Sequence, residues 1–381
     1  MAAPIELEPI RLGNNVTIAW PVALAPMAGV TDAVFRGLCR AQGSGYATTE
    51  FARDRALLLG VRDQVALTDI GADERPAGVQ LFGADPDEMR RAAALVVALR
   101  RPDVLDINMG CPAPKVTKGQ GGSSLLREPA RAQAIVAAVV REVAPTPVTV
   151  KIRVGWDEAH KATGVAVDVA QRAVAAGAQM VTVHGRTREQ KYEGHACWDT
   201  ISAVAAAVPV PVIGNGDVTS PEEAARRLRT SGCRGIAIGR GARGRPWLFR
   251  QIRAHLRGAP VPPEPDVAAR VSLGLEHIRR QRAEALRLLR EDPARAKRPE
   301  AALATEADMH TLGRMLPHVM WYVWGVPGAA AARRALSRAR TGRELEDILA
   351  DVLARPHAYE ACDGAADAVG GHEPAGGPTG V

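Results

Sequence analysis

The stretch VLDINMGCP, residues 104–112, has the form of a buried strand that ends in a reactive turn. Residues 104–107 are mainly apolar and of strand length, and Gly110 and Pro112 must break the strand, so we expect Cys111 at its carboxyl end. Residues 115–122 contain two lysines and three glycines, which is typical of a mobile loop that covers a site. Two interpretations of Cys111 are open at this point: a small buried hydrophobic residue, or a thiol that takes part in chemistry.

Runs of the same kind recur at fairly regular intervals before and after this stretch. We count eight of them, at residues 22–25, 46–49, 78–81, 104–107, 148–152, 180–183, 210–213 and 235–238. Most are followed by a polar or glycine-bearing turn and then by a segment of helical period, as at residues 86–99, 130–143, 165–176 and 221–229. Eight strand and helix units predict a closed parallel (β/α)8 TIM barrel, in which reactive groups gather at the carboxyl ends of the strands.

The chain changes character after this repeating part. A proline-rich linker at residues 258–265 precedes two segments of helical period, 267–289 and 309–352, which a charged, proline-containing stretch separates. We therefore predict a barrel domain over residues 1–257 and a small all-α C-terminal domain over residues 267–355. Residues 363–381 are rich in glycine, alanine and proline, and we expect them to be disordered.

Charge and composition narrow the classes of partner. The formal net charge of +7 favours a polyanionic partner, although a GC-rich genome would also raise the arginine content. Five cysteines, odd in number and without close-spaced pairs, indicate neither a disulfide framework nor a metal site. The N-terminus lacks the pattern of a secretory leader and no apolar run reaches membrane-spanning length, so we expect a cytoplasmic protein without a membrane partner.

The residues at or just past the carboxyl end of each predicted strand form a polar, mixed set. They are Pro26, Met27 and Ala28; Glu50; Gln80; Asn108 and Cys111; Lys151 and Arg153; His184 and Arg186; Asn215, Gly216 and Asp217; and Gly239 and Arg240. The last two groups are glycine turns after strands seven and eight, where barrels of this kind commonly hold a phosphate.

Two of these side chains suggest a particular ligand. Gln80 and Lys151 suit a flat heterocycle with donors and acceptors on its edge, such as an isoalloxazine, and a cation would stabilise the negative charge of a reduced flavin. The alternative for Lys151 is a salt bridge to Asp106 or Glu50. For His184 the alternatives are a core residue and a contact with phosphate or substrate.

Taken together, the strand-end motifs resemble those of bacterial tRNA-dihydrouridine synthases, in particular the B-type branch. The matching stretches are APMAGVTDAVFR (25–36), VQLFGADPDEM (79–89), DINMGCPAPKV (106–116), KIRVGW (151–156), HGRTREQKYEG (184–194), NGD (215–217) and GRGARGRPWLF (239–249). The resemblance implies a barrel that binds FMN, in which NADPH reduces the flavin, hydride passes to C6 of a uridine in tRNA, and a cysteine thiol protonates C5.

The resemblance also implies roles for individual residues. Cys111 would be the catalytic proton donor. The residues implied to hold FMN are Pro26, Met27, Ala28, Gln80, Lys151, His184, Asn215, Gly216, Asp217, Gly239 and Arg240. Those expected to contact tRNA are Asn108, Lys115, Lys118, Arg153 and Arg186. No obligate protein partner is evident.

The helical domain departs from the family pattern. Residues 316–318, Leu-Pro-His, stand where an Arg-Lys-His run is usual, and residues 283–311 are longer than the usual connection. We still expect arginines of this domain to bind the tRNA backbone, namely Arg279, Arg280, Arg282, Arg314, Arg333 and Arg334. Two competing functions are a flavin barrel that reduces a free pyrimidine or an enone, and a non-catalytic RNA-binding barrel. The basic charge and helical domain argue against the first, and Cys111 with an intact flavin set argues against the second.

Overall fold

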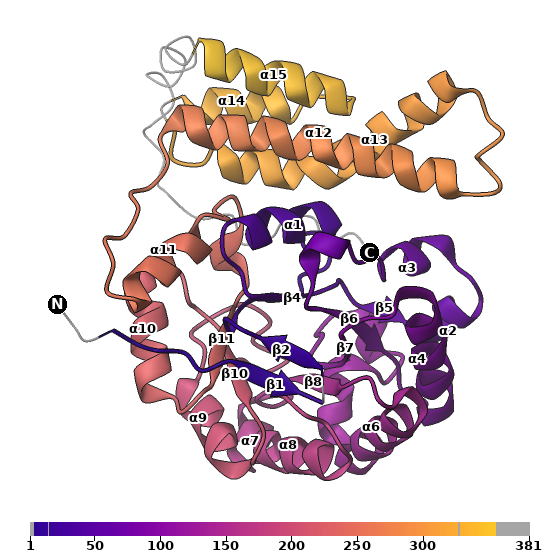
Figure 1. Ribbon diagram of the computed structural model, residues 1–381, viewed down its shortest axis with the longest axis vertical. Coiled ribbons are helices and arrows are strands. Elements are labelled where there is room, and N and C mark those ends of the chain that lie inside the picture. Colours follow the sequence, from indigo (N-terminus) through magenta and orange to yellow (C-terminus); the bar gives the residue numbers. More distant parts are fainter. Residues whose placement is uncertain (1–3, 14, 327, 356–381) are drawn as a thin grey trace. The chain divides into compact units, whose positions relative to one another are not determined.

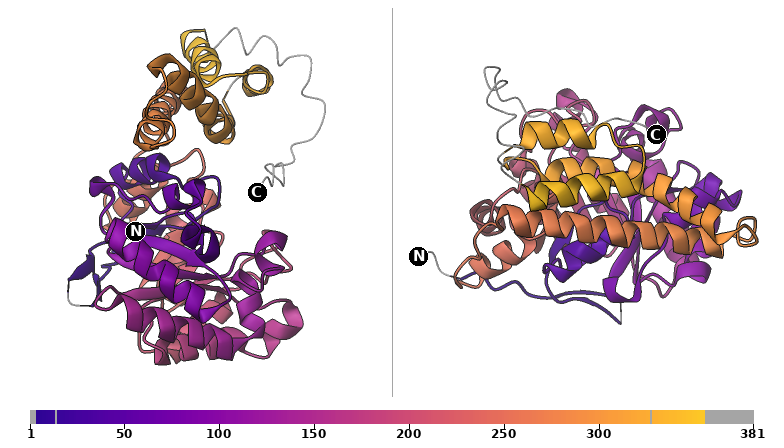
Figure 2. Two further views of the ribbon diagram at one scale, coloured as in Figure 1. Left: turned by 90° about the vertical axis from the view of Figure 1, so that its right-hand side faces the viewer. Right: turned by 90° about the horizontal axis from the view of Figure 1, so that it is seen from above.

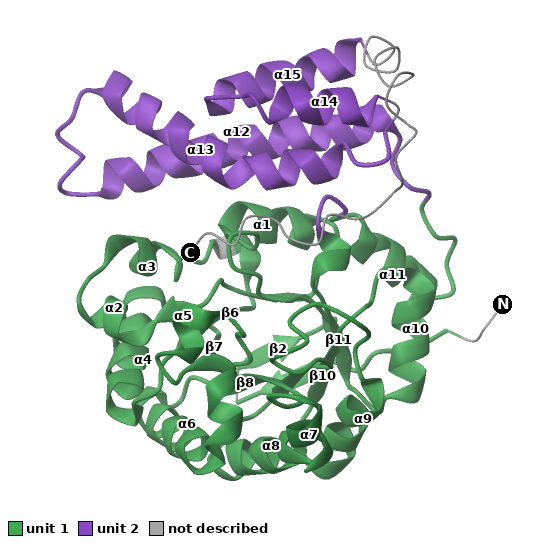
Figure 3. Ribbon diagram, turned by 180° about the vertical axis from the view of Figure 1, so that it is seen from behind, with its two compact units in different colours: residues 1–242, 246–262 green, residues 243–245, 263–381 purple. Residues whose placement is uncertain are grey.

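The computed structural model describes residues 4–13, 15–326 and 328–355, and it divides into two compact units (Figures 1 and 3). One unit comprises residues 1–242 and 246–262, and the other comprises residues 243–245 and 263–381. The tail predicted to be disordered, residues 363–381, lies outside the described residues. Within the described part of the chain, no helix combines the length and apolar character that crossing a membrane requires.

The first unit is a closed parallel barrel, as predicted. Each of the eight expected runs forms a strand: β3 (Val22–Leu24), β4 (Tyr46–Thr48), β6 (Ala77–Phe82), β7 (Val104–Met109), β8 (Val148–Arg153), β9 (Val181–His184), β10 (Val212–Asn215) and β11 (Gly235–Ile238). They pair in parallel in chain order, and β11 returns to β3 with Ile236 opposite Val22. Helices cover the outer face of the barrel, which explains why the strands are almost continuously apolar.

The helices that cover the barrel are α1 (Ala33–Ala41), α4 (Pro86–Arg100), α6 (Pro129–Val143), α8 (Val165–Ala175), α9 (Trp198–Ala207), α10 (Pro221–Thr230) and α11 (Leu248–Leu256). Among them, α1, α4 and α10 begin at a side-chain cap. In α10, Ser220 accepts a hydrogen bond from the Glu223 N–H, and Pro221 occupies the first turn. Shorter helical segments interrupt the connections: α2 (Asp54–Leu58), α3 (Arg62–Ala66), η1 (Ala72–Glu74), α5 (Pro114–Thr117), η2 (Gly122–Arg127), α7 (Glu158–Ala162) and η3 (Arg240–Ala242).

A small antiparallel hairpin, which the sequence did not suggest to us, closes one end of the barrel (Figure 1). It consists of β1 (Ile10–Leu12) and β2 (Val16–Ile18). Ile10, Leu12 and Ile18 are buried against residues at the strand starts, such as Tyr46 and Val104. The hairpin therefore seals the amino-terminal end of the barrel, opposite the end at which reactive side chains gather.

A bulge interrupts the second barrel strand beside its carboxyl end. Thr48 lies opposite Gly78, whereas Ala52 of the short strand β5 (Ala52–Arg53) lies opposite Leu81, so residues 49–51 face only two residues of β6. The Thr49 hydroxyl accepts the Gln80 N–H at 3.1 Å and so replaces a missing carbonyl of the ladder. Bulges of this kind re-aim side chains next to active sites.

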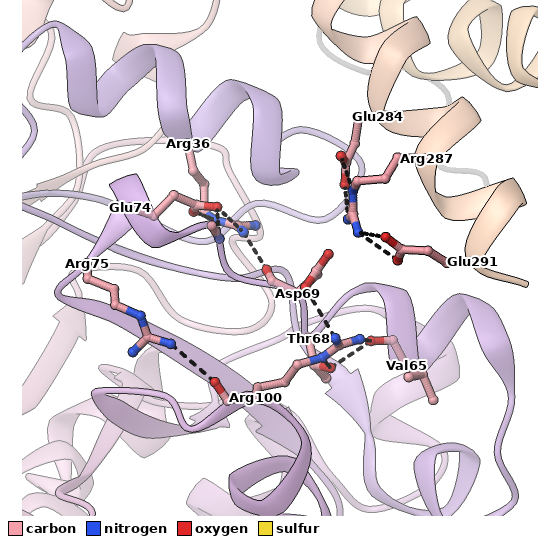
Figure 4. Close-up of polar contacts among 11 residues, drawn as sticks. Arg36, Val65, Thr68, Asp69, Glu74, Arg75, Arg100, Glu284, Arg287 and Glu291 are labelled. Carbon is pink, nitrogen blue, oxygen red and sulfur yellow. Dashed lines mark hydrogen bonds and ion pairs between the residues drawn. The ribbon is translucent and has the colours of Figure 1, made fainter.

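Two arginines, the buried Arg36 and the partly buried Arg100, fix the segment that precedes β6 (Figure 4). The Arg36 guanidinium forms a buried salt bridge with Glu74, with 2.5 Å between Nε and Oε2, and also donates to the Asp69 carbonyl. Arg100 donates to the Thr68 hydroxyl and the Val65 carbonyl. Removing one partner of a buried pair costs about 3–5 kcal/mol, so Arg36 is a structural residue.

The second unit is all-α, as predicted. Its helices are α12 (Val267–Glu291), α13 (Glu300–Tyr322), α14 (Ala329–Leu336) and α15 (Gly342–Ala354). Helices α12 and α13 pack side by side as a long helical hairpin (Figure 2), around a core that includes Ile278, Met315 and Val319. Helix α13 begins at Glu300 rather than at residue 309, where the sequence predicted its start. Its first turns belong to the charged stretch that was expected to separate the two helical segments.

The arginines expected to grip RNA from α12 already have carboxylate partners. Arg279 and Arg282 both pair with Glu346 of α15, and Arg280 pairs with Glu276. Further along α12, Arg287 bridges Glu284 and Glu291 (Figure 4). Glu276 and Arg280 are one helical turn apart on α12, whereas Glu346 belongs to another helix, and contact of Arg279, Arg280 and Arg282 with tRNA remains a prediction.

Candidate active site

Asn108, at the carboxyl end of β7, holds the turn that carries Cys111. Its Oδ1 accepts the N–H groups of Gly110 and Cys111 at 3.0 and 2.8 Å. Its Nδ2 donates to Gln80 Oε1 of the neighbouring strand at 2.8 Å. Because both ends of the amide are used, its orientation is fixed, and so is the start of the reactive turn.

The hydrogen bonds continue from Gln80 into the barrel interior. Gln80 Nε2 donates to Asp106 Oδ2 at 2.6 Å, and the Thr149 hydroxyl donates to Asp106 Oδ1 at 2.5 Å. Thr149, Asp106, Gln80 and Asn108 thus form one buried series, which we call the amide chain. Burial raises the pKa of Asp106, while its two hydrogen bonds oppose that rise.

The Cys111 thiol is buried, with a residue exposure of 8%, and burial raises its pKa. The thiol therefore stays protonated at neutral pH. The following loop folds back over it through Gly122 at φ +56°, where an added Cβ would lie 2.8 Å from the Cys111 carbonyl oxygen. Ser123 fastens this loop by donating to the Gly110 carbonyl through its hydroxyl and to the Cys111 carbonyl through its N–H.

Lys151 lies beside Asn108, on the neighbouring strand β8. Burial, reinforced by the charge of Arg153, lowers its pKa to about 8. Among the residues that the structure describes, no carboxylate lies within salt-bridge distance of its ammonium, so the alternative of a pair with Asp106 or Glu50 is not observed; Glu50 instead accepts the Gly29 N–H. A small cavity inside the barrel is lined by Lys151 and Asp106 together with Tyr46, Thr48 and Thr182.

Arg153 and Arg186 are both buried and bind backbone carbonyls. Arg153 Nε donates to Gly110, and its Nη1 donates to Thr187 and Lys191. Arg186 donates to the carbonyls of residues 193 and 194 and pairs with Asp217 at 2.7 Å. Through these hydrogen bonds the two arginines stabilise the Cys111 turn and the loop after β9. Direct contact with a substrate remains a prediction for both.

The two glycine turns lie side by side after β10 and β11. Asn215 Nδ2 donates to the Ala237 carbonyl, and Gly216 at φ +138° lets Asp217 turn toward the Ala196 N–H. Burial alone would raise the pKa of Asp217, but the Ala196 N–H and the Arg186 guanidinium outweigh it and lower the pKa.

Space for a ligand remains at the second turn. An added Cβ on Gly239 would meet no atom closer than the Met27 sulfur at 3.8 Å. Arg240, which follows it, is partly exposed and contacts Asp217 and the Tyr192 carbonyl. Met27 itself is held by Thr31, whose hydroxyl accepts the Met27 N–H. Pro26 lines the internal cavity, while Ala28 is exposed.

His184 ends β9 among several positive charges. Burial lowers its pKa well below the usual value, and the charges of Arg153 and Lys151 act in the same direction. The imidazole is therefore neutral at pH 7, and one ring nitrogen is an acceptor.

Three side chains of the surrounding loops are exposed. Lys115 and Lys118 lie on and just after α5, at the rim beside Cys111. Tyr192 is 56% exposed, and the guanidinium groups of Arg153 and Arg240 lie over its ring at 5.8 and 5.3 Å. We did not select Tyr192 from the sequence, although a single aromatic residue in the basic stretch HGRTREQKYEG was a usable signal.

Comparison with known proteins agrees with this geometry. The dihydrouridine synthase family model matches residues 23–356. The chain belongs to this family. Similar proteins include a probable tRNA-dihydrouridine synthase of Mycobacterium tuberculosis, 37% identical over 350 residues that cover 89% of this chain and 84% of the relative. The tRNA-dihydrouridine synthase B of Pseudomonas putida is 43% identical over 272 residues, which cover 71% of this chain and 79% of the relative. The resemblance inferred from the motifs is thereby confirmed.

Proposed function

We propose that this dihydrouridine synthase uses FMN and NADPH to reduce uridines of tRNA to 5,6-dihydrouridine. The observation that carries the proposal is the Cys111 thiol, which is protonated, buried and held by the amide chain, and which lies within electrostatic range of the Lys151 ammonium. Saturating the C5–C6 double bond of uracil needs a hydride at one carbon and an acid at the other. Cys111 is an acid placed for the second of these tasks.

The residues present fit FMN. Lys151 is a largely buried cation without a described carboxylate partner, and Gly239 leaves space in which a phosphate could approach the backbone. We assign the isoalloxazine edge to Gln80 and Lys151, and the phosphate to the turns of Asn215, Gly216, Asp217, Gly239 and Arg240, with Pro26, Met27, Ala28 and His184 completing the site. When bound and reduced by NADPH, FMN supplies the hydride for C6.

Cys111 then has a single task, which is to hold a proton at Sγ and release it to C5. The positive charges of Arg153 and Lys151 lower the pKa of the thiol and so oppose the effect of burial. The same charges stabilise the thiolate that remains after the transfer. Solvent returns the proton once the product leaves.

We assign tRNA as the substrate on the names of the relatives and on the exposed groups around the site. Lys115 and Lys118 can contact backbone phosphates, and the Tyr192 ring offers a face on which an unstacked base can lie. In this proposal the barrel, residues 1–257, carries the flavin chemistry, and the helical domain, residues 267–355, contributes to binding tRNA. The alternative substrate, a free pyrimidine, would not need these exposed groups.

A Cys111→Ala variant tests the proposal. We expect it to retain bound FMN and normal reduction by NADPH, while dihydrouridine formation in unmodified tRNA falls about a hundredfold or more, the usual scale for a lost general acid. Cys233→Ala is the matched control, because Cys233 is also buried but lies near Gly214, behind the strand ends. Normal product formation by Cys111→Ala would remove the thiol from the mechanism, and equal turnover of free uridine and tRNA would favour the alternative substrate.

A further inference from the structure

A shallow pocket lies on the barrel unit between the ends of α1 and α11. It has a volume of about 440 Å³ and is lined by Gln42, Gly43, Arg250, Arg253, Arg257 and Ala259, among others. Residues 42 and 43 lead into the start of β4, and residue 259 follows the end of α11. The pocket is therefore at the amino-terminal end of the barrel strands, opposite Cys111 and outside the proposed active site.

The three arginines of this pocket have no acidic partner in the described part of the chain. Among the described residues, none of them forms a salt bridge, whereas Arg226 and Arg227 on the neighbouring helix α10 both pair with Glu223. Arg253 Nε and Gln42 Oε1 are buried without a hydrogen-bond partner in the part of the chain that the structure describes. Buried polar groups are normally satisfied, so this pocket has unused capacity to bind a polar ligand.

Trp20 holds the arginines in place. The guanidinium carbons of Arg253 and Arg257 lie 5.3 and 5.6 Å from the centre of its ring. Burial lowers the pKa of Arg253, and the charges of Arg257 and Arg40 lower it further, so the positive charges of the pocket repel one another. A bound anion would relieve this repulsion, and the order imposed by Trp20 reduces the entropy that binding would otherwise cost.

We propose that this pocket binds phosphate groups. A planar guanidinium group can donate two parallel hydrogen bonds to two oxygens of one phosphate. Three cations around one pocket suit a multiply charged oligophosphate better than a single carboxylate. The phosphate can belong to a small phosphorylated molecule or to an RNA backbone. The site is independent of the proposed reduction, because it shares no residue with the amide chain or with the glycine turns.

Calorimetric titration of the FMN-loaded protein with inorganic pyrophosphate tests the site. The pocket variant is Arg250→Ala/Arg257→Ala, in which both residues are exposed, and the control is Arg91→Ala/Arg141→Ala, which removes equal charge from exposed positions on α4 and α6. We expect the pocket variant to bind pyrophosphate about tenfold or more weakly than wild type, while the control binds normally. Arg253→Lys, which keeps the charge but not the fork, should also weaken binding.

The affinity of the same variants for labelled tRNA distinguishes the two sources of phosphate. Unchanged tRNA affinity in the pocket variant, with weakened pyrophosphate binding, supports a small phosphorylated ligand. Weakened tRNA affinity, together with competition between tRNA and pyrophosphate, supports a backbone contact. The proposal is overturned if wild type does not bind pyrophosphate, or if the pocket and control variants lose equal affinity, since net charge alone would then explain the effect.

Discussion

At the scale of single residues, Asn108 decides where the proton donor lies. In Asn108→Ala the N–H groups of Gly110 and Cys111 lose their acceptor, and Gln80 Oε1 loses its donor. Unsatisfied buried groups cost about 1–3 kcal/mol each, so we expect the turn to open. Dihydrouridine formation should fall about tenfold or more although Cys111 is still present.

Alkylation of the thiols provides a readout of this variant that does not depend on activity. The rate at which iodoacetamide modifies Cys111, measured by mass spectrometry, should rise in Asn108→Ala. Cys197 is the internal reference, because it is partly exposed and remote from the turn in sequence. An unchanged Cys111 rate would show that the loop fastened by Ser123 holds the turn without Asn108.

Lys151 gives the proposed flavin site a pH dependence. With a pKa of about 8, the free protein loses the ammonium charge as pH rises past 8. A ligand edge that accepts a hydrogen bond from the ammonium, as we propose for the isoalloxazine, raises this pKa on binding, so the dissociation constant of FMN should increase above pH 8 until the pKa of the complex is reached. FMN affinity should therefore fall about tenfold between pH 7.5 and 9.5, and Lys151→Gln should bind weakly at both values. A wild-type affinity that is flat across this range would contradict the assignment of Lys151.

The polar groups at the strand ends could be predicted from the sequence, but the residues that hold them by hydrogen bonds could not. The strands are easily recognised, and asking which polar residues end or follow each strand finds Gln80, Asn108 and Cys111. Asp106 and Thr149 lie inside strands and 43 residues apart, so only the register of β7 and β8 brings them together. Contact of Arg153 with the substrate remains a prediction, and only the fold shows that its guanidinium also donates to the carbonyls of Gly110 and Thr187.

At the scale of elements, the strands and major helices follow from apolar periodicity, while the short pieces do not. The hairpin of β1 and β2 consists of three-residue strands, which carry too few residues for a period to be evident. The bulge at residues 49–51 depends on pairing with β6, which no local pattern encodes.

The pair of helices α12 and α13 buries a histidine that must stay neutral. Burial lowers the pKa of His277 well below its usual value, and the neighbouring His318 and the charge of Arg280 add to the effect. The unfolded chain therefore takes up a proton below about pH 6.5 that the folded chain does not. As the pH decreases below this value, the free energy of unfolding falls by up to about 1.4 kcal/mol per pH unit.

Urea unfolding at pH 7.5 and 5.5 checks this expectation. In His277→Phe, the number of protons taken up on unfolding between these pH values should be smaller by about one, so the free energy of unfolding should depend less on pH. The variant also loses the contact with the Tyr322 hydroxyl. His310→Gln is the control, because His310 is on the same helix pair but exposed. Equal pH dependence in wild type and His277→Phe would show that His277 is charged in the folded state.

At the scale of the whole molecule, the barrel depends on its hairpin seal. Ile18 is 1% exposed and packs inside the cluster that spans the strand starts. Ile18→Ala should lower the free energy of unfolding by about 2–5 kcal/mol, the range for buried large-to-small changes. Val61→Ala, at a position that is 44% exposed, should change it by less than about 0.5 kcal/mol in the same urea titration. Similar values for the two variants would mean that the hairpin is not part of the cooperative unit.

The hairpin also has a consequence for synthesis on the ribosome. Ile10, Leu12 and Ile18 emerge first, but the ring that buries them closes only when β11 pairs with β3. Roughly two hundred residues separate the two events, which at about 5–20 residues per second is a delay of roughly ten to forty seconds. Throughout that delay the nascent chain exposes an apolar segment near its N-terminus, and this segment is where we expect a ribosome-associated chaperone to bind.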